Sequence, residues 1–272
     1  MDLIELNKIA IKAAISAGKV IHKYMNDDVT VEQKNGGSSY ASKVVTEADR
    51  ECEKAILSHL LPTCEALDIA LLTEETEDDG SRFIKEYFWC IDPMDGTLPF
   101  INKRPGFSVS IALVAKDGTP FIGIVLDPST DTLYHAIRGH GVFKNGRHLE
   151  ISNTNDHLSY LTDKPLNDSP RSAEIESLLI KYTEKLDLKG VKEIAGAGAV
   201  MNAINVIENG PALMLKFPKK EPGGGSIWDF AATACIYHEL DLTATNYEGG
   251  KLDLNRKDGT YMNHEGVFLS NF

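Results

Sequence analysis

Cysteines and long apolar runs are scarce in this 272-residue sequence. No two cysteines have the C-x-x-C spacing of a zinc site or redox motif, so we expect all four (Cys52, Cys64, Cys90 and Cys235) to be reduced, as in a cytoplasmic protein. No apolar run approaches the roughly 18 residues of a membrane span. The N-terminus also lacks the basic and apolar regions of a signal peptide.

Positive charge is scarce as well. The chain has 28 Lys and Arg against 40 Asp and Glu, a net charge of −12, which argues against a nucleic acid polymer or an anionic membrane as partner. The eight histidines lack the H-x-x-x-H and H-x-H spacings of zinc hydrolases, and the D-x-D-x-D-G loop of calcium-binding modules does not occur. No internal repeat is present.

Apolar spacing predicts a protein of the α/β (α+β) class, with helices at 3–25 and 46–60 separated by a polar glycine–serine loop at 34–43. An antiparallel meander is then expected from five strand-like runs, at 69–72, 87–91, 107–115, 121–126 and 132–137. Beyond residue 160, helices alternate with short buried strands, the helices at 170–186, 200–208 and 227–238 and the strands at 191–195, 212–215 and 266–270. We expect two closely packed halves, 1–155 and a smaller α/β half, 156–272.

The most informative segment is 89–97, WCIDPMDGT, in which an apolar strand is followed by a turn bearing two carboxylates. Asp92 and Asp95 are hard oxygen ligands of the kind that Mg²⁺ prefers. Gly96 removes a side chain where a ligand would approach closely, and Thr97 with the following amides can face an anion. The alternative is a pair of chain-reversing turns, since Asp-Pro and Asp-Gly are common turn dipeptides.

Three further acidic residues occupy positions suited to a site. Glu74 directly follows the apolar run at 69–72, whereas the acids at 77–79 are expected to be a solvated run. Asp49 and Asp229 each lie in the first turn of a predicted helix, where a capping role is the alternative. A carboxylate there stays ionised beside the positive helix end, so capping and metal binding are compatible.

Four segments together resemble the signature blocks of the inositol monophosphatase superfamily, in family order: VTEAD (45–49), LTEE (72–75), IDPMDGT (91–97) and WDFAA (228–232). These enzymes are Mg²⁺-dependent, lithium-sensitive phosphatases, and they include bisphosphate nucleotidases and fructose-bisphosphatases. The resemblance implies a layered α/β/α/β/α sandwich with an antiparallel-rich N-terminal sheet, a possible homodimer, and a site for two or three Mg²⁺ ions.

The resemblance also implies a role for each matching residue. Glu74 and Asp92 would hold an activating metal together with the Met94 carbonyl and the Thr97 hydroxyl. Asp92 would bridge to a second metal held by Asp95 and Asp229, and a third metal would lie near Asp49. The catalytic residues would be Asp49, Glu74 and Thr97, with Asp49 as proton acceptor and the other two helping to deprotonate the attacking water. The amides of Gly96 and Thr97 would stabilise charge on the phosphoryl group.

Several details favour the bacterial CysQ-type 3′(2′),5′-bisphosphate nucleotidases as the most similar group. Thr73 precedes the Glu pair, and the run at 95–101 and the tail at 261–267 resemble theirs, although Leu98-Pro99 replaces a usual Lys-Glu. A second phosphate needs cations away from the metals, and three lysines precede Asp229: Lys216, Lys219 and Lys220. The alternative for these lysines is a solvated loop.

The predicted reaction is therefore hydrolysis of a small phosphorylated metabolite, with 3′-phosphoadenosine 5′-phosphate giving AMP and phosphate as the favoured case. An inositol, sugar or polyol phosphatase is the alternative, and a non-catalytic metal-binding relative is a further one. A haloacid-dehalogenase-type phosphatase is disfavoured, because its motif separates the two carboxylates by one residue, whereas two residues separate them here.

Overall fold

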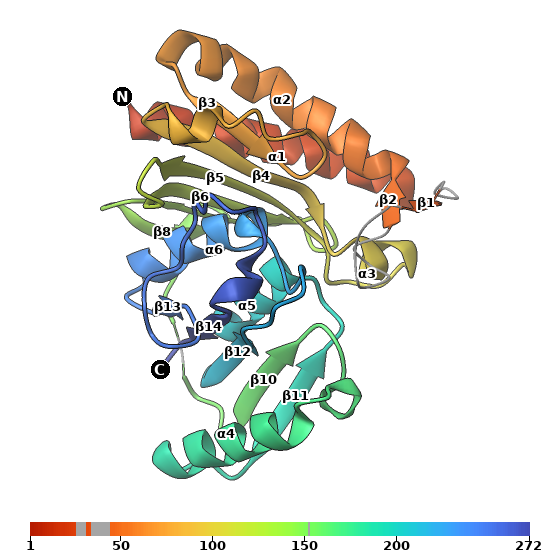
Figure 1. The fold of residues 1–272 in the computed structure, drawn as a ribbon, viewed down its shortest axis with the longest axis vertical. Coiled ribbons are helices and arrows are strands. Elements are labelled where there is room, and N and C mark those ends of the chain that lie inside the picture. The colour runs from red at the N-terminus through yellow and green to blue at the C-terminus, as the bar shows by residue number, and fades with distance from the viewer. Residues whose placement is uncertain (26–30, 34–43, 152) are drawn as a thin grey trace.

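The computed structural model describes residues 1–25, 31–33, 44–151 and 153–272 (Figure 1). The polar loop predicted at 34–43 lies outside the described residues. Two short strands pair antiparallel at its borders, β1 (Val31–Gln33) and β2 (Val44–Thr46). Within the described part of the chain, no helix is long and apolar enough to cross a membrane.

Five layers stack along the long axis of the molecule (Figure 1). Helices α1 (Leu3–Met25) and α2 (Glu47–Leu67) cover one face of a seven-stranded sheet. Helices α5 (Ala199–Glu208) and α6 (Ile227–Glu239) lie between this sheet and a five-stranded sheet, whose far face carries α4 (Ser172–Lys185). The predicted α/β/α/β/α sandwich is therefore confirmed.

The seven-stranded sheet has the order β3-β4-β5-β6-β7-β8-β9. Its strands are β3 (Ala70–Thr73), β4 (Tyr87–Asp95), β5 (Ser108–Ala115), β6 (Pro120–Asp127), β7 (Thr132–Ile137), β8 (Gly141–Lys144) and β9 (Arg147–His148). Strands β4 to β9 form the predicted antiparallel meander, extended by β8 and β9, which were not predicted. Strand β3 instead runs parallel to β4, because the connection at 74–86 returns the chain to the same end of the sheet.

The prediction for the second helix was wrong at its C-terminal end. Helix α2 continues through Pro62 to Leu67 rather than ending near residue 60. Its last turns are held against the sheet, because the buried Thr63 hydroxyl accepts a hydrogen bond from the indole N–H of Trp89 on β4 at 2.9 Å. This tertiary contact is one of the interactions that stabilise the helix beyond Pro62.

The five-stranded sheet has the order β11-β10-β12-β14-β13. It comprises β10 (Leu158–Thr162), β11 (Val191–Ala195), β12 (Ala212–Lys216), β13 (Thr243–Thr245) and β14 (Val267–Ser270), with β10, β11 and β12 mutually parallel. Strand β11 was predicted to be buried, but it is an edge strand whose side chains, apart from that of Ile194, are exposed. The boundary between the halves near residue 155 stays a prediction.

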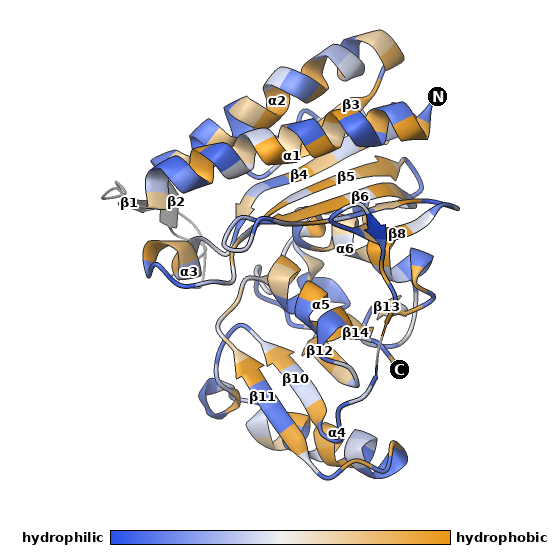
Figure 2. Cartoon of the chain, turned by 180° about the vertical axis from the view of Figure 1, so that it is seen from behind, coloured by the Kyte–Doolittle hydropathy of each residue, from blue (hydrophilic) through white to orange (hydrophobic). Residues whose placement is uncertain are grey.

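The middle helical layer carries Asp229 and packs directly against the sheet that carries Asp92 and Asp95. Helix α6 is buried on nearly all sides, and β5 and β6 are apolar along most of their length (Figure 2). The helix approaches β6 so closely that a Cβ atom at Gly123 would lie 2.2 Å from the carbonyl oxygen of Ala232. The Ser110 hydroxyl on β5 also donates to the carbonyl of Trp228 at 3.0 Å, so the first turn of α6 is fixed above β4 and β5.

Candidate metal centre

A β-bulge in β4 brings two carboxylates to one face of the sheet. Asp92 and Asp95 are three residues apart, so a regular strand would direct them to opposite faces. They pair with Ser110 and Ser108, which are only two residues apart, and one extra residue is therefore accommodated on β4. Both side chains then face the middle helical layer. The sequence prediction ended this strand before Asp92, whereas the strand continues to Asp95.

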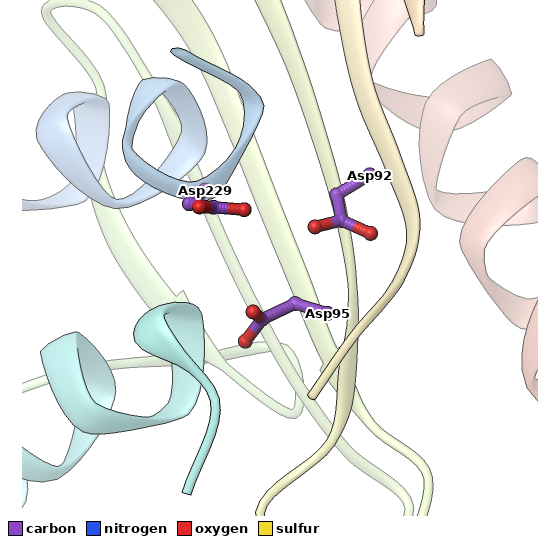
Figure 3. A group of neighbouring side chains, drawn as sticks. All are labelled: Asp92, Asp95 and Asp229. Atoms are coloured by element: carbon purple, nitrogen blue, oxygen red, sulfur yellow. The ribbon is translucent and has the colours of Figure 1, made fainter. Parts of the chain in front are cut away.

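Asp229 joins these two residues from the first turn of α6. Carboxylate oxygens of Asp92, Asp95 and Asp229 all lie within 4.8 Å of one another, and the three side chains converge (Figure 3). Asp229 also completes a capping box with Ser226, whose backbone N–H donates to Asp229 Oδ2 at 2.7 Å. Asp229 is therefore both a capping residue and a member of the carboxylate cluster, and its role as a metal ligand stays a prediction.

The cluster is electrostatically strained. Burial raises the pKa of Asp92 well above its usual range, and the nearby charges of Glu74, Asp229 and Asp95 raise it further. Burial and then Asp229 raise the pKa of Asp95, and burial raises the pKa of Asp229, although a hydrogen bond from Asp92 opposes that increase. Like charges held this close in a buried site favour binding of protons or cations.

Asp95 also connects the cluster to the second half of the chain. Its two oxygens accept hydrogen bonds from the backbone N–H groups of Ala199 at 3.2 Å and Val200 at 2.9 Å, at the start of α5. Gly198 leaves room for this approach, since a Cβ atom there would lie 2.2 Å from Asp95 Oδ2. Sequence reasoning missed these residues. The signal was the pair of glycines in GAGA (196–199), directly before an apolar helix.

Glu74 and Asp49 lie outside the group of carboxylates within 4.8 Å. Glu74 follows β3, and its backbone N–H donates to the carbonyl of Ile91 at 3.2 Å, so the residue lies beside the end of β4. Its charge contributes to the raised pKa of Asp92. Asp49 is buried in the first turn of α2. Among the acids at 77–79, Asp78 departs from the predicted solvated run, because it pairs with the buried Arg82 at 2.7 Å.

The remaining residues of the DPMDGT segment lie next to the cluster. The backbone N–H of Met94 donates to Asp92 Oδ1 at 3.0 Å, within the bulge. Thr97 begins the short helix α3 (Thr97–Ile101) and is partly buried. Gly96 has φ of 81°, and a Cβ atom there would lie 2.5 Å from the carbonyl oxygen of Gly106. Its missing side chain therefore has a packing cause, and its contact with phosphate stays a prediction.

A cleft of about 480 Å³ opens at the carboxyl ends of β10 and β12. Lys216 and Lys219 line it, whereas Lys220 is exposed and is not among its lining residues. The Lys216 ammonium bonds the carboxylate of Asp163. Burial opposes its charge, but Asp163, Asp229 and Asp95 together raise the pKa of Lys216 above its usual value. Lys216 is therefore a cation between the cleft and the carboxylate cluster.

The donor set fits Mg²⁺. Three buried carboxylates supply hard oxygen ligands, and a divalent cation would offset both the burial of their charges and the repulsion that further raises the pKa values of Asp92 and Asp95. The hydroxyl of Ser108, directly opposite Asp95 in the sheet, is fully buried without a hydrogen-bond partner among the described residues. Such an atom is consistent with a polar group bound at this face.

A family-model match over nearly the whole chain, with which the buried carboxylates agree, places this protein in the class of metal-dependent phosphoric monoester hydrolases. The sequence model described as "Inositol monophosphatase family" matches residues 2–270. The chain therefore belongs to the inositol monophosphatase family, whose members use Mg²⁺, and the predicted superfamily is confirmed. The finer resemblance to CysQ-type nucleotidases stays a prediction.

Curated relatives and solved structures agree with this assignment. The chain is 28% identical to human inositol monophosphatase 2 over 255 residues, which cover 92% of this chain and 83% of that protein. It is 30% identical to Nus factor SuhB of Xylella fastidiosa over 245 residues, covering 89% and 82%. The structure of an inositol monophosphatase from Anabaena superposes with a TM-score of 0.70 at 23% identity, covering 100% and 92%, and supports the fold.

Proposed function

We propose that this protein hydrolyses a small phosphate monoester and that its preferred substrate carries a second anionic group, as a 3′(2′),5′-bisphosphate nucleotide does. In this proposal Glu74, Asp92, Asp95 and Asp229 hold Mg²⁺, with further contacts from the Met94 carbonyl and the Thr97 hydroxyl. When bound, Mg²⁺ neutralises phosphate charge and lowers the pKa of water.

The residues around the cations orient the reactants and accept the proton. Glu74 and Thr97 accept hydrogen bonds from the attacking water, and Asp49 is the proposed proton acceptor. Burial of the carboxylates excludes bulk water, which strengthens each electrostatic interaction at the phosphoryl group. The amides of Gly96 and Thr97 are proposed donors to the phosphate.

The position of Lys216 carries the substrate proposal. Its ammonium lies at the wall of the cleft and is influenced by Asp95 and Asp229, so a phosphate on the remote part of a substrate could reach it. A cleft of about 480 Å³ lies within the usual range for small-molecule sites. Two solved structures of this fold support nucleotide phosphates as the substrate class. They are a 2′AMP-bound staphylococcal IMPase-II and an IMPase/NADP phosphatase complexed with NADP and Ca²⁺.

An inositol or other polyol phosphate is the second candidate. The observation that favours it is Asp163, whose partly exposed carboxylate lies at the same cleft and offers acceptors to hydroxyl groups. The curated relatives named as inositol monophosphatases also favour this candidate.

The test is a turnover panel with Mg²⁺ on 3′-phosphoadenosine 5′-phosphate, AMP, inositol 1-phosphate and fructose 1,6-bisphosphate. Lys216→Gln should raise KM for the bisphosphate about 10-fold or more, as expected when a charged contact is lost, with little change for inositol 1-phosphate. Lys220→Gln, an exposed residue outside the cleft lining, is the matched control. Equal effects of Lys216→Gln on both substrates would refute the second-anion proposal, and no turnover of any monoester would refute the phosphatase itself.

A further inference from the structure

Glu53 is a buried acid that the proposed reaction does not use. Glu53 on α2 is only 9% exposed, and its Oε1 accepts hydrogen bonds from the hydroxyls of Thr73 at 2.9 Å and Thr76 at 3.0 Å. These two threonines flank Glu74 and Glu75 in the sequence. A buried carboxylate requires such partners, and here both partners come from the segment that carries a proposed metal ligand.

The alternation of side chains along β3 explains why this contact matters for Glu74. Ala70 and Leu72 point into the core between the two sheets, the same face that carries Asp92. Thr73 therefore points to the opposite face, toward α2, where Glu53 accepts its hydrogen bond. When the alternation of side chains along β3 continues by one residue, the side chain of Glu74 faces the carboxylate cluster. A shift of one residue in the register of this segment would turn the Glu74 side chain away from the cluster.

The element that carries Glu53 is itself firmly placed. The hydrogen bond between Thr63 and Trp89 fixes the other end of α2 against β4. Asp49 lies four residues before Glu53, so both acids share one face of the helix. Helix α2 therefore presents a proposed proton acceptor and a contact to the Glu74 segment from one rigid surface.

We propose that Glu53 is a positioning residue that fixes Glu74 toward Asp92 through the hydroxyls of Thr73 and Thr76. We call these three residues the Glu53 clamp. The inference rests on the proposed function, because it assigns Glu74 to the Mg²⁺ site. The clamp touches neither substrate nor metal, and it acts by holding the end of β3 in register.

The test compares Mg²⁺ binding by calorimetry, without substrate, in the full-length wild type and three variants. Glu53→Ala removes the acceptor, and Thr73→Val removes one donor at nearly constant volume. Glu65→Ala, an exposed position on the same helix, is the matched control. Glu53→Ala and Thr73→Val should weaken Mg²⁺ binding about 10- to 100-fold, as is typical when a residue behind a metal ligand is lost, while Glu65→Ala leaves it unchanged.

Two further measurements separate positioning from general destabilisation. In turnover assays, Glu53→Ala should raise the Mg²⁺ concentration for half-maximal rate and lower kcat, with KM for the phosphate ester within about twofold of wild type. Glu53→Gln should retain most of the Mg²⁺ affinity, because its amide oxygen can still accept both hydroxyl hydrogen bonds. The Glu53→Ala/Thr73→Val double variant should bind Mg²⁺ no more weakly than the more affected single variant.

Folded Glu53→Ala with wild-type Mg²⁺ affinity and kcat would overturn the clamp. If Glu53→Ala fails to fold, Thr73→Val decides, and unchanged Mg²⁺ binding by that variant overturns the clamp equally. A wild-type protein that binds no Mg²⁺ would contradict the metal site and with it the proposed function. If the wild type binds Mg²⁺ and the Glu53 and Thr73 variants bind it equally well, only the proposal of the Glu53 clamp would be contradicted.

Discussion

The substitution Gly198→Ala tests the site without removing any carboxylate. The backbone of Gly198 has φ of −63° and ψ of 169°, which any residue adopts, so alanine adds no backbone strain. Its Cβ atom, however, would lie 2.2 Å from Oδ2 and 2.7 Å from Cγ of Asp95, whereas ordinary contacts begin near 3.4 Å. The carboxylate of Asp95 is the movable partner, and it must shift by about 1 Å, the difference between these distances.

A displacement of this size is large for a catalytic group. A misplacement of about 1 Å can cost a factor of about 10² in rate, so we expect Gly198→Ala to lower kcat about 100-fold and to weaken Mg²⁺ binding. The fold should persist. Replacing glycine by alanine before the first turn of α5 costs about 1 kcal/mol, and weakening the hydrogen bonds from Ala199 and Val200 to Asp95 costs about 1–3 kcal/mol more, so Tm should decrease by roughly 4–16 °C.

The assay measures kcat, KM and calorimetric Mg²⁺ affinity beside the melting temperature. Gly190→Ala is the matched control, because the nearest atom to its added Cβ would be His157 Cδ2 at an unstrained 3.6 Å. Near-normal kcat and Mg²⁺ binding in folded Gly198→Ala would show that Asp95 need not occupy its present position. That result would refute our interpretation of the contact between β4 and α5.

Three other predictions concern the cluster as a whole. Asp229→Asn should lower kcat by a factor of about 10² or more while keeping Tm close to wild type, since the amide oxygen can still accept the Ser226 N–H; an active variant would contradict the ligand assignment. Burial raises the pKa values of Asp92, Asp95 and Asp229 above the usual 3.8, and repulsion from neighbouring carboxylates adds to this for Asp92 and Asp95, so the metal-free folded state binds more protons than the unfolded state above that pH. The unfolding free energy then falls as pH rises above 3.8. Tm in EDTA should therefore increase on acidification from about pH 7.5 to about pH 5.5, and it should increase less with saturating Mg²⁺. A Tm that decreases over this range would argue against the raised pKa values. Millimolar Li⁺ should inhibit turnover relative to K⁺ at equal ionic strength, as the family resemblance implies, and identical rates would count against it.

The sequence alone predicted those elements whose apolar periodicity is strong. Helices α1, α4, α5 and α6 begin and end within about two residues of the predicted bounds, because α1 and α4 each bury an apolar stripe and α5 and α6 are apolar runs that are buried nearly throughout. Strands β8 and β9 were missed because they are short and partly exposed, so they carry little alternation. The burial of β11 was overestimated, since local apolarity does not say which strand occupies a sheet edge.

In the candidate site, too, residues in local sequence patterns could be predicted, whereas contacts between distant segments could not. Asp92, Asp95 and Asp229 could be named from the sequence because each lies in a recognisable local pattern. The bulge that turns Asp92 and Asp95 to one face could not be predicted, since it depends on pairing with Ser108 and Ser110 on another strand. The amides of α5 and the acceptor role of Glu53 likewise depend on contacts between distant segments.

The bonds from Asp95 to α5 have a consequence for how the chain could be divided. A fragment ending near residue 155 would keep Asp92 and Asp95 but would lose Asp229 and both amides that hold Asp95. Neither piece alone could assemble the three carboxylates. If two separately produced fragments bind Mg²⁺ only after mixing, that binding shows that the fragments have associated. Mg²⁺ binding would therefore measure whether the two sheets have come together.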